Sequence, residues 1–137
     1  MNIEDVHKWE KAVITLLNFD GWELEWCGGG FDHYDAVGRT PKGFECVMEM
    51  KFRQKYYAAK MLEVDKYNRL MDMPHDMVKL YFINDPKVNC MFYLNTIKLP
   101  DPVEMYCPNT TLWQNKKIKK LCYLLEEDDA SILNINI

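Results

Sequence analysis

Residues 44–51, FECVMEMK, constrain the fold more than any other stretch of the chain. Every second side chain from Phe44 to Met50 is apolar, which predicts a β-strand with that face turned toward a core. The opposite face of the same strand carries Glu49 and Lys51. A half-apolar strand of this kind needs a layer of helices or strands to cover it.

The residues around this strand predict the order of the other elements. Residues 4–18 place apolar side chains at helical spacing, and Gly21 is a plausible stop. WELEWC and YDAVGR have the alternation of strands, and the turn TPKG joins the second of them to FECVMEMK as a hairpin. Further elements are expected as a helix at about 58–71, strands at 77–83 and 88–97, a loop at 101–115 and a strand at 116–125. This order predicts an α/β fold with a central mixed β-sheet flanked by helices.

The length of 137 residues predicts one domain, residues 1–137, with a core that needs no disulfides. No apolar run approaches the roughly 20 residues of a membrane span. The opening MNIEDVHKWE does not resemble a secretory signal. Five widely spaced cysteines without a CxxC pair indicate reduced core residues, and therefore a cytoplasmic protein.

The net charge of −4 is concentrated in the run EEDD at residues 126–129, which is expected to begin an acidic C-terminal tail. The rest of the chain is neutral overall and can still carry a basic face. The lack of a basic excess nevertheless lowers the affinity expected for long DNA.

The chemistry of the chain centres on Glu49 and Lys51, which are two residues apart and therefore leave the same face of their strand. Asp35 lies on the preceding strand, and the hairpin can bring it opposite Glu49. Two carboxylates that converge on one point suit Mg²⁺ (or Mn²⁺), which usually binds one or two carboxylates together with substrate phosphate. The alternative is an ordinary ion pair between Glu49 and Lys51 on a strand face.

Against a phosphodiester, such an ion would polarise a phosphoryl oxygen and lower the pKa of a bound water. Lys51 could orient or deprotonate that water, or stabilise the charge of the transition state. We favour the second role, because two carboxylates would hold the proton on the amine. Glu10, on the first helix, could bind a second metal or a metal-bound water, although most helix glutamates are simply solvated.

The set Glu10, Asp35 and Glu49-Met50-Lys51 resembles the PD-(D/E)xK nuclease superfamily. The likeness covers residues 4 to about 83 and is greatest to small phage nucleases and to Holliday-junction resolvases of the archaeal type. EKAVITLLNFDGW matches the helix with its glutamate, YDAVG the Asp motif, and MEMKFR the end of the ExK strand. Tyr34 stands where many members have proline.

This resemblance implies a restriction-endonuclease-like core and a role for each matching residue. Asp35, Glu49 and the backbone carbonyl of Met50 would bind the metal with help from Glu10, and Lys51 would be the catalytic lysine. The resemblance also implies phosphate contacts from Arg53 and Lys66, and a homodimer, since symmetric cutting of two strands needs two sites.

A basic and aromatic cluster follows the ExK strand. Tyr56 and Tyr57 interleave with Arg53, Gln54, Lys55 and Lys60. This mixture suits contact with DNA through its backbone, although a solvated charge cluster is the alternative. A second basic patch, open to the alternative of a solubilising strand edge, comprises Lys116, Lys117, Lys119 and Lys120.

Two nearby features have weaker patterns. Gly28-Gly29-Gly30 is expected to be a flexible strand connection, because no phosphate-loop motif follows it. His33 could share the strand face of Asp35, which it precedes by two residues.

We therefore expect a metal-dependent DNA endonuclease, possibly acting on branched DNA, in the cytoplasm of a host cell if the protein is phage-encoded. The alternative is a catalytically inactive nuclease-fold module that binds nucleic acid or a protein partner. A third reading is an inhibitor that mimics DNA through the acidic run.

Overall fold

The computed structural model describes residues 2–30, 34–108 and 117–134. Its elements, in chain order, are α1 (Ile3–Phe19), β1 (Glu23–Trp26), β2 (Ala36–Arg39), β3 (Glu45–Phe52), β4 (Ala59–Glu63), α2 (Val64–Met71), β5 (Val78–Asn84), β6 (Asn89–Tyr93), β7 (Val103–Pro108), β8 (Lys117–Glu126), the 3₁₀ helix η1 (Glu127–Asp129) and β9 (Ser131–Ile132).

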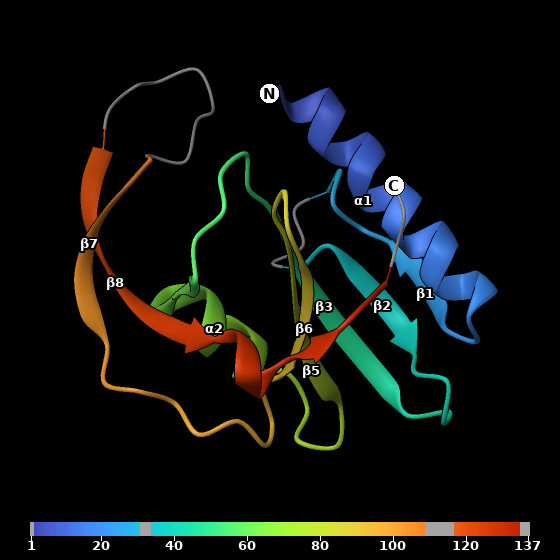
Figure 1. Ribbon diagram of the computed structural model, residues 1–137. Coiled ribbons are helices and arrows are strands. Elements are labelled where there is room, and N and C mark those ends of the chain that lie inside the picture. The colour runs from blue at the N-terminus through green and yellow to red at the C-terminus, as the bar shows by residue number, and fades with distance from the viewer. Residues whose placement is uncertain (1, 31–33, 109–116, 135–137) are drawn as a thin grey trace.

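The centre of the molecule is a six-stranded sheet with the order β1-β2-β3-β5-β6-β9. Strands β3 and β5 run parallel, and the other neighbours are antiparallel. The parallel pair requires a crossover, which β4 and α2 supply on one face of the sheet (Figure 1). The predicted central mixed sheet is therefore confirmed.

Helix α1 covers one face of this sheet (Figure 1). It begins at Asn2, whose side chain accepts a hydrogen bond from the backbone N–H of Asp5 at 2.9 Å, and such a cap satisfies one of the free N–H groups of the first turn. Val13 and Leu17 are buried in a core with Met48 of β3. The helical spacing of these apolar residues thus fixes which side of α1 meets the sheet.

The opposite face of the sheet packs against a second layer. This layer is the three-stranded sheet β4-β8-β7 together with α2. Leu62, Leu70 and Leu125 from this layer are buried with Val47 and Tyr81 of the central sheet. Strand β3 is therefore covered on both faces, which explains why its residues from Cys46 to Met50 are all buried.

Two predicted elements are wrong. The helix expected from residue 58 begins only at Val64, because residues 59–63 form β4 and pair with β8. The loop expected at 101–115 contains β7, which pairs with β8 along its whole length. In both segments, pairing with a strand distant in the sequence decides the structure. The rest of the predicted loop, from residue 109 on, lies outside the described part of the chain.

The acidic run at 126–129 does not begin a free tail. It comprises the end of β8 and η1, and β9 then joins the central sheet beside β6. The carboxylate of Glu127 lies 3.0 Å from the ammonium nitrogen of Lys60, which is 1% exposed. This contact ties Glu127 to the core, while Glu126, Asp128 and Asp129 stay exposed.

The prediction of core cysteines is confirmed for Cys46, Cys90 and Cys122, which are buried. Cys27 is only partly buried. Among the described residues, no helix combines the length and apolar character needed to cross a membrane.

Candidate active site

Asp35 and Glu49 meet where the β2–β3 hairpin ends. Ala36 is paired with Met48, and the backbone N–H of Asp35 donates to the carbonyl of Met48 at 2.9 Å. The ladder ends at this pair, and Asp35 lies close enough to Glu49 for its charge to raise the pKa of Glu49. The carboxylate of Asp35 also accepts a hydrogen bond from the backbone N–H of Met50 at 2.8 Å, which holds it against β3.

Glu10 reaches this point from α1. It is only 4% exposed, and its Oε1 accepts a hydrogen bond of 3.0 Å from the indole N–H of Trp26. The carboxyl groups of Glu10 and Asp35 lie close together, and the charge of Glu10 raises the pKa of Asp35. The structure thus brings together the helix glutamate and the Asp motif.

Trp26 and Gly28 hold this arrangement, and neither was singled out from the sequence as a site residue. A Cβ atom on Gly28 would lie 2.7 Å from Oε1 of Glu10 and 2.9 Å from Nε1 of Trp26. The position therefore excludes a side chain, so one glycine of the expected strand connection has a packing role. Alternation in WELEWC marks Trp26 only as a core residue and gives no sign of its hydrogen bond.

Glu49 has a cation beside it. The ammonium nitrogen of Lys66, on α2, lies 3.1 Å from Oε1 of Glu49 and 3.6 Å from Oε2 of Glu63. Glu63, at the end of β4, also binds Lys120 at 2.6 Å. Lys66, which the resemblance places at a phosphate, is thus held at a carboxylate instead.

The three carboxyl groups all resist ionisation. Burial raises the pKa of Asp35 to about 6, and the charge of Glu10 adds to the effect. Burial raises the pKa of Glu49 to about 7, even though Lys66 acts in the opposite direction. The pKa of Glu10 is raised mainly by burial as well. Negative charge is therefore costly here, and a cation would relieve that cost.

Lys51 lies in different surroundings from those expected. Burial lowers its pKa to about 8, and the positive charges of Lys66 and Arg53 lower it further than the nearby carboxylates raise it. The expectation that carboxylates would hold its proton is thus wrong for this structure. An amine with a pKa this close to neutrality can exchange a proton with water.

These side chains line a small cleft between β3 and β4. Glu49, Lys51, Arg53 and Lys66 border it together with Tyr81. Gln54 and Lys55, predicted as DNA contacts, lie in the exposed loop after β3 and do not line the cleft. Among the described residues, no carboxylate forms an ion pair with the guanidinium of Arg53. The guanidinium is therefore available to bind an anion.

The oxygen atoms of these side chains are the donor type that a hard divalent cation prefers, but they are not spaced to bind one in the described structure. Over the described residues, no three His, Cys, Asp or Glu side chains lie close enough to hold a metal as they stand. All the donors are oxygens, which Mg²⁺ prefers, and one or two carboxylates are enough for it. A cation would have to displace the ammonium group of Lys66 from Glu49 and any proton held by the carboxyl groups of raised pKa. His33 lies outside the described residues.

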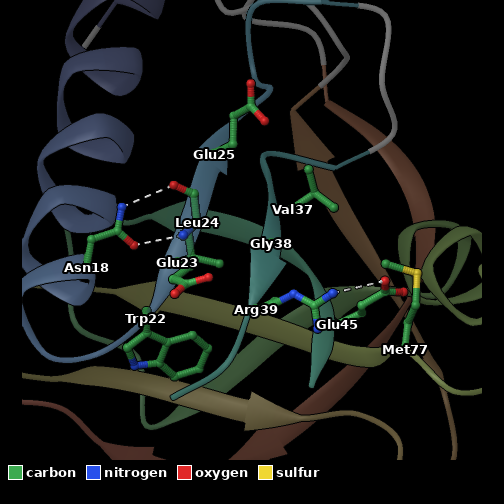
Figure 2. Close-up of a pocket in the computed structure, with 10 residues that line it drawn as sticks. All are labelled: Asn18, Trp22, Glu23, Leu24, Glu25, Val37, Gly38, Arg39, Glu45 and Met77. Atoms are coloured by element: carbon green, nitrogen blue, oxygen red, sulfur yellow. Dashed lines mark hydrogen bonds and ion pairs between the residues drawn. The ribbon is translucent and has the colours of Figure 1, made fainter. Parts of the chain in front are cut away.

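A larger hollow of about 700 Å³ lies at the β1–β2 edge of the sheet (Figure 2). The carboxylates of Glu23, Glu25 and Glu45 border it, and Arg39 lies 3.7 Å from Glu45. Asn18 closes one side through two hydrogen bonds to the backbone of Leu24. Exposed acids repel a phosphate backbone, so this hollow is not a candidate for nucleic-acid chemistry.

No protein-family model matches the chain, and no curated protein matches it in sequence. A solved structure that does match is a Holliday-junction resolvase of the hyperthermophilic archaeon Archaeoglobus fulgidus. The TM-score is 0.60 over 92% of this chain and 89% of that chain, at 14% sequence identity. The chain has a restriction-endonuclease-like fold. At this identity the likeness shows the fold alone, and function has to be argued from the site.

Proposed function

We propose that the protein is a metal-dependent DNA endonuclease that acts on branched or otherwise structured DNA. The observation that carries the proposal is a group of three neighbouring acids: Glu10 and Glu49 are only 4% and 8% exposed, and the charges of Glu10, Asp35 and Glu49 raise one another's pKa. Buried acids gathered in this way suit a divalent cation. The preference for branched DNA is supported by the activity of the similarly folded archaeal resolvase.

Asp35, Glu49 and the carbonyl of Met50 would hold the ion, and Glu10 would bind it or one of its waters. When bound, Mg²⁺ or Mn²⁺ supplies polarisation of the phosphoryl oxygen and a water of lowered pKa. Lys51 is placed to accept a proton from the attacking water and to return it during the reaction, because its pKa of about 8 allows both protonation states. Arg53 binds the phosphate.

The test is cleavage of a four-way junction and of supercoiled plasmid by the purified protein in Mg²⁺ or Mn²⁺. Asp35→Asn and Glu49→Gln should each abolish the cut while leaving the fold intact. Glu45→Gln is the matched control, since Glu45 is an exposed residue of the same strand. Cleavage at the wild-type rate by either site variant, or cleavage in EDTA, would refute this assignment.

A homodimer forms part of the same proposal, because two coordinated cuts need two sites. Light scattering of the free protein and of its junction complex measures this directly. Two protomers on each junction are expected, and a single protomer that cuts both strands would contradict the dimer without affecting the site.

A second candidate function is a nuclease-fold module that binds DNA without cutting it. The ammonium group of Lys66, 3.1 Å from Glu49, favours it, because an internal cation already stands at a carboxylate the metal would need. This function predicts equal affinity for junction DNA in EDTA and in Mg²⁺, with no product after long incubation. An increase in affinity with the metal and a cut product would exclude it.

A further inference from the structure

A cavity of about 310 Å³ lies next to the candidate active site. Arg53 and Met61 line both this cavity and the cleft of Glu49 and Lys51, so the two spaces are neighbours. We propose that the cavity binds one unpaired nucleobase of the DNA beside the phosphate to be cut. The proposal rests on the endonuclease function proposed above and names what the substrate must present.

The lining suits a flat ring. Met61, Ile83 and Leu124 contribute aliphatic surface, while Tyr57 and Tyr106 contribute aromatic surface. The two tyrosines are 55% and 67% exposed, so their rings remain available to a ligand. Bases stack on aromatic side chains whatever their identity, because every base has a π-face.

Two of the charged groups in the wall, Lys60 and Asp85, are already satisfied. The ammonium nitrogen of Lys60 lies 2.6 Å from both the carbonyl of Tyr57 and the carboxylate of Asp85. The other carboxylate oxygen of Asp85 accepts backbone hydrogen bonds from Lys87 and Val88 at 2.8 and 3.0 Å. The cavity therefore offers few hydrogen-bonding groups to a ligand. We expect a base to stack on the tyrosine rings without strong selection among the four bases.

The rim carries the guanidinium of Arg53, which can bind a phosphate. The ammonium group of Lys119 lies 5.6 Å from the ring centre of Tyr106 and 3.7 Å from the carboxylate of Glu104, which offsets part of its charge. Aromatic surface with a cation beside it matches the two parts of a nucleotide, a ring and a phosphate. A neutral apolar ligand would use only the aromatic part.

The base has to be unpaired, because a base within a duplex is covered by its neighbours. Taking it out of the stack costs least where pairing is already broken, as at a branch or a bulge. The cavity would thus make structured DNA a better substrate than plain duplex.

Two DNA probes test the proposal, a duplex with a one-nucleotide bulge and the same duplex with an abasic bulge. They share shape and charge and differ only in the base. Fluorescence anisotropy in EDTA measures binding without cleavage. We expect the wild-type protein to bind the base-containing bulge roughly tenfold more tightly, as one stacked base provides. Equal affinity for the two probes would overturn the proposal.

Variants locate the effect. Tyr106→Ala should remove the preference and leave binding of the abasic probe unchanged, and Tyr57→Ala should act in the same direction. Tyr93→Ala, a partly exposed tyrosine of β6 that does not line the cavity, is the matched control and should keep the preference. If Tyr106→Ala weakens both probes equally, the residue has only a structural or electrostatic role and the proposal fails.

The outcome can be separated from that of the proposed function. Asp35→Asn should lose cleavage and still prefer the base-containing bulge. Should the wild-type protein cut no DNA in Mg²⁺ or Mn²⁺, the endonuclease proposal falls, while the anisotropy measurement still decides whether the cavity binds a base.

Discussion

Replacing Glu49 with Gln should stabilise the metal-free protein above neutral pH. Glu49 is 8% exposed, and burial raises its pKa to about 7 from an ordinary value of 4.5. Between these two pH values the folded chain keeps the proton, whereas the unfolded chain releases it. The stability of the wild-type protein therefore falls as the pH rises through this window. Gln is neutral throughout and avoids this loss.

The size of the effect follows from the two pKa values. Their difference corresponds to roughly 3 kcal/mol once the pH is above 7, and the interaction with Lys66 is already part of it, since Lys66 lowers the same pKa. The variant gives back part of this, because an amide does not reproduce every hydrogen bond of a neutral carboxyl group. We expect a net gain of about 2 kcal/mol at pH 8, or roughly 8 °C in Tm for a chain of this length, and almost none below pH 4.5.

Thermal unfolding followed by circular dichroism, in EDTA at pH 4.5 and 8, measures this difference. The same comparison at pH 8 with Mn²⁺ at about a hundred times its Kd should reverse the order. The wild-type protein would then gain about 2.7 kcal/mol, and the variant much less. Glu45→Gln, at an exposed position of the same strand, should show neither effect.

The reasoning is refuted if Glu49→Gln is no more stable than the wild-type protein at pH 8 in EDTA. The ionised carboxylate would then be well compensated by Lys66. The site would have no unmet demand for a second cation, and the binding-module function would be the better explanation.

Three further substitutions test other parts of the structure. Lys51→Ala should slow single-turnover cleavage by roughly 10²–10³-fold and change junction affinity little, and an unchanged rate would remove Lys51 from the reaction. Gly38→Ala would place a Cβ atom against the backbone carbonyl of Glu23 and force β1 away from β2. Urea unfolding should then show a free energy of unfolding lower by at least about 2 kcal/mol. A urea midpoint equal to that of the wild-type protein would contradict this close approach. Lys60→Ala leaves Asp85 buried without its ammonium partner, so the free energy of unfolding in the same assay should fall by about 3–5 kcal/mol. A small decrease would mean that water replaces the ammonium group.

The elements from α1 to β3 could be predicted because their signals are local. A helical stripe identifies α1, and the TPKG turn joins two alternating segments into a hairpin. The period of two along β3 also places Glu49 and Lys51 on one face, and the hairpin brings Asp35 to the same edge. Residue spacing was enough for this part of the site.

Strands β4 and β7 could not be predicted in the same way. Within β4 the buried positions hold Lys60 and Leu62, and a buried lysine hides the apolar alternation of the strand. Lys60 is tolerated there only because Asp85 and Glu127 come to it from other elements. A sequence pattern does not reveal an ion-pair partner 25 or more residues away, so the pattern of residues 59–63 predicts a helix.

The same limitation applies to Lys66, and it bears on how the site works. The resemblance to the nuclease superfamily implies a phosphate contact for Lys66, yet the structure places its ammonium group at Glu49. The contact with Glu49 and a contact with phosphate are both possible for Lys66 if a divalent ion takes its place at the carboxylates. Without metal, Lys66 and the raised pKa values of Glu10 and Asp35 limit the buried negative charge. A divalent ion bound between the carboxylates would supply the same charge from one point, and Lys66 would then be free to turn toward the phosphate. The metal-free arrangement would thus be the resting state of a site in which binding of the ion releases a DNA contact.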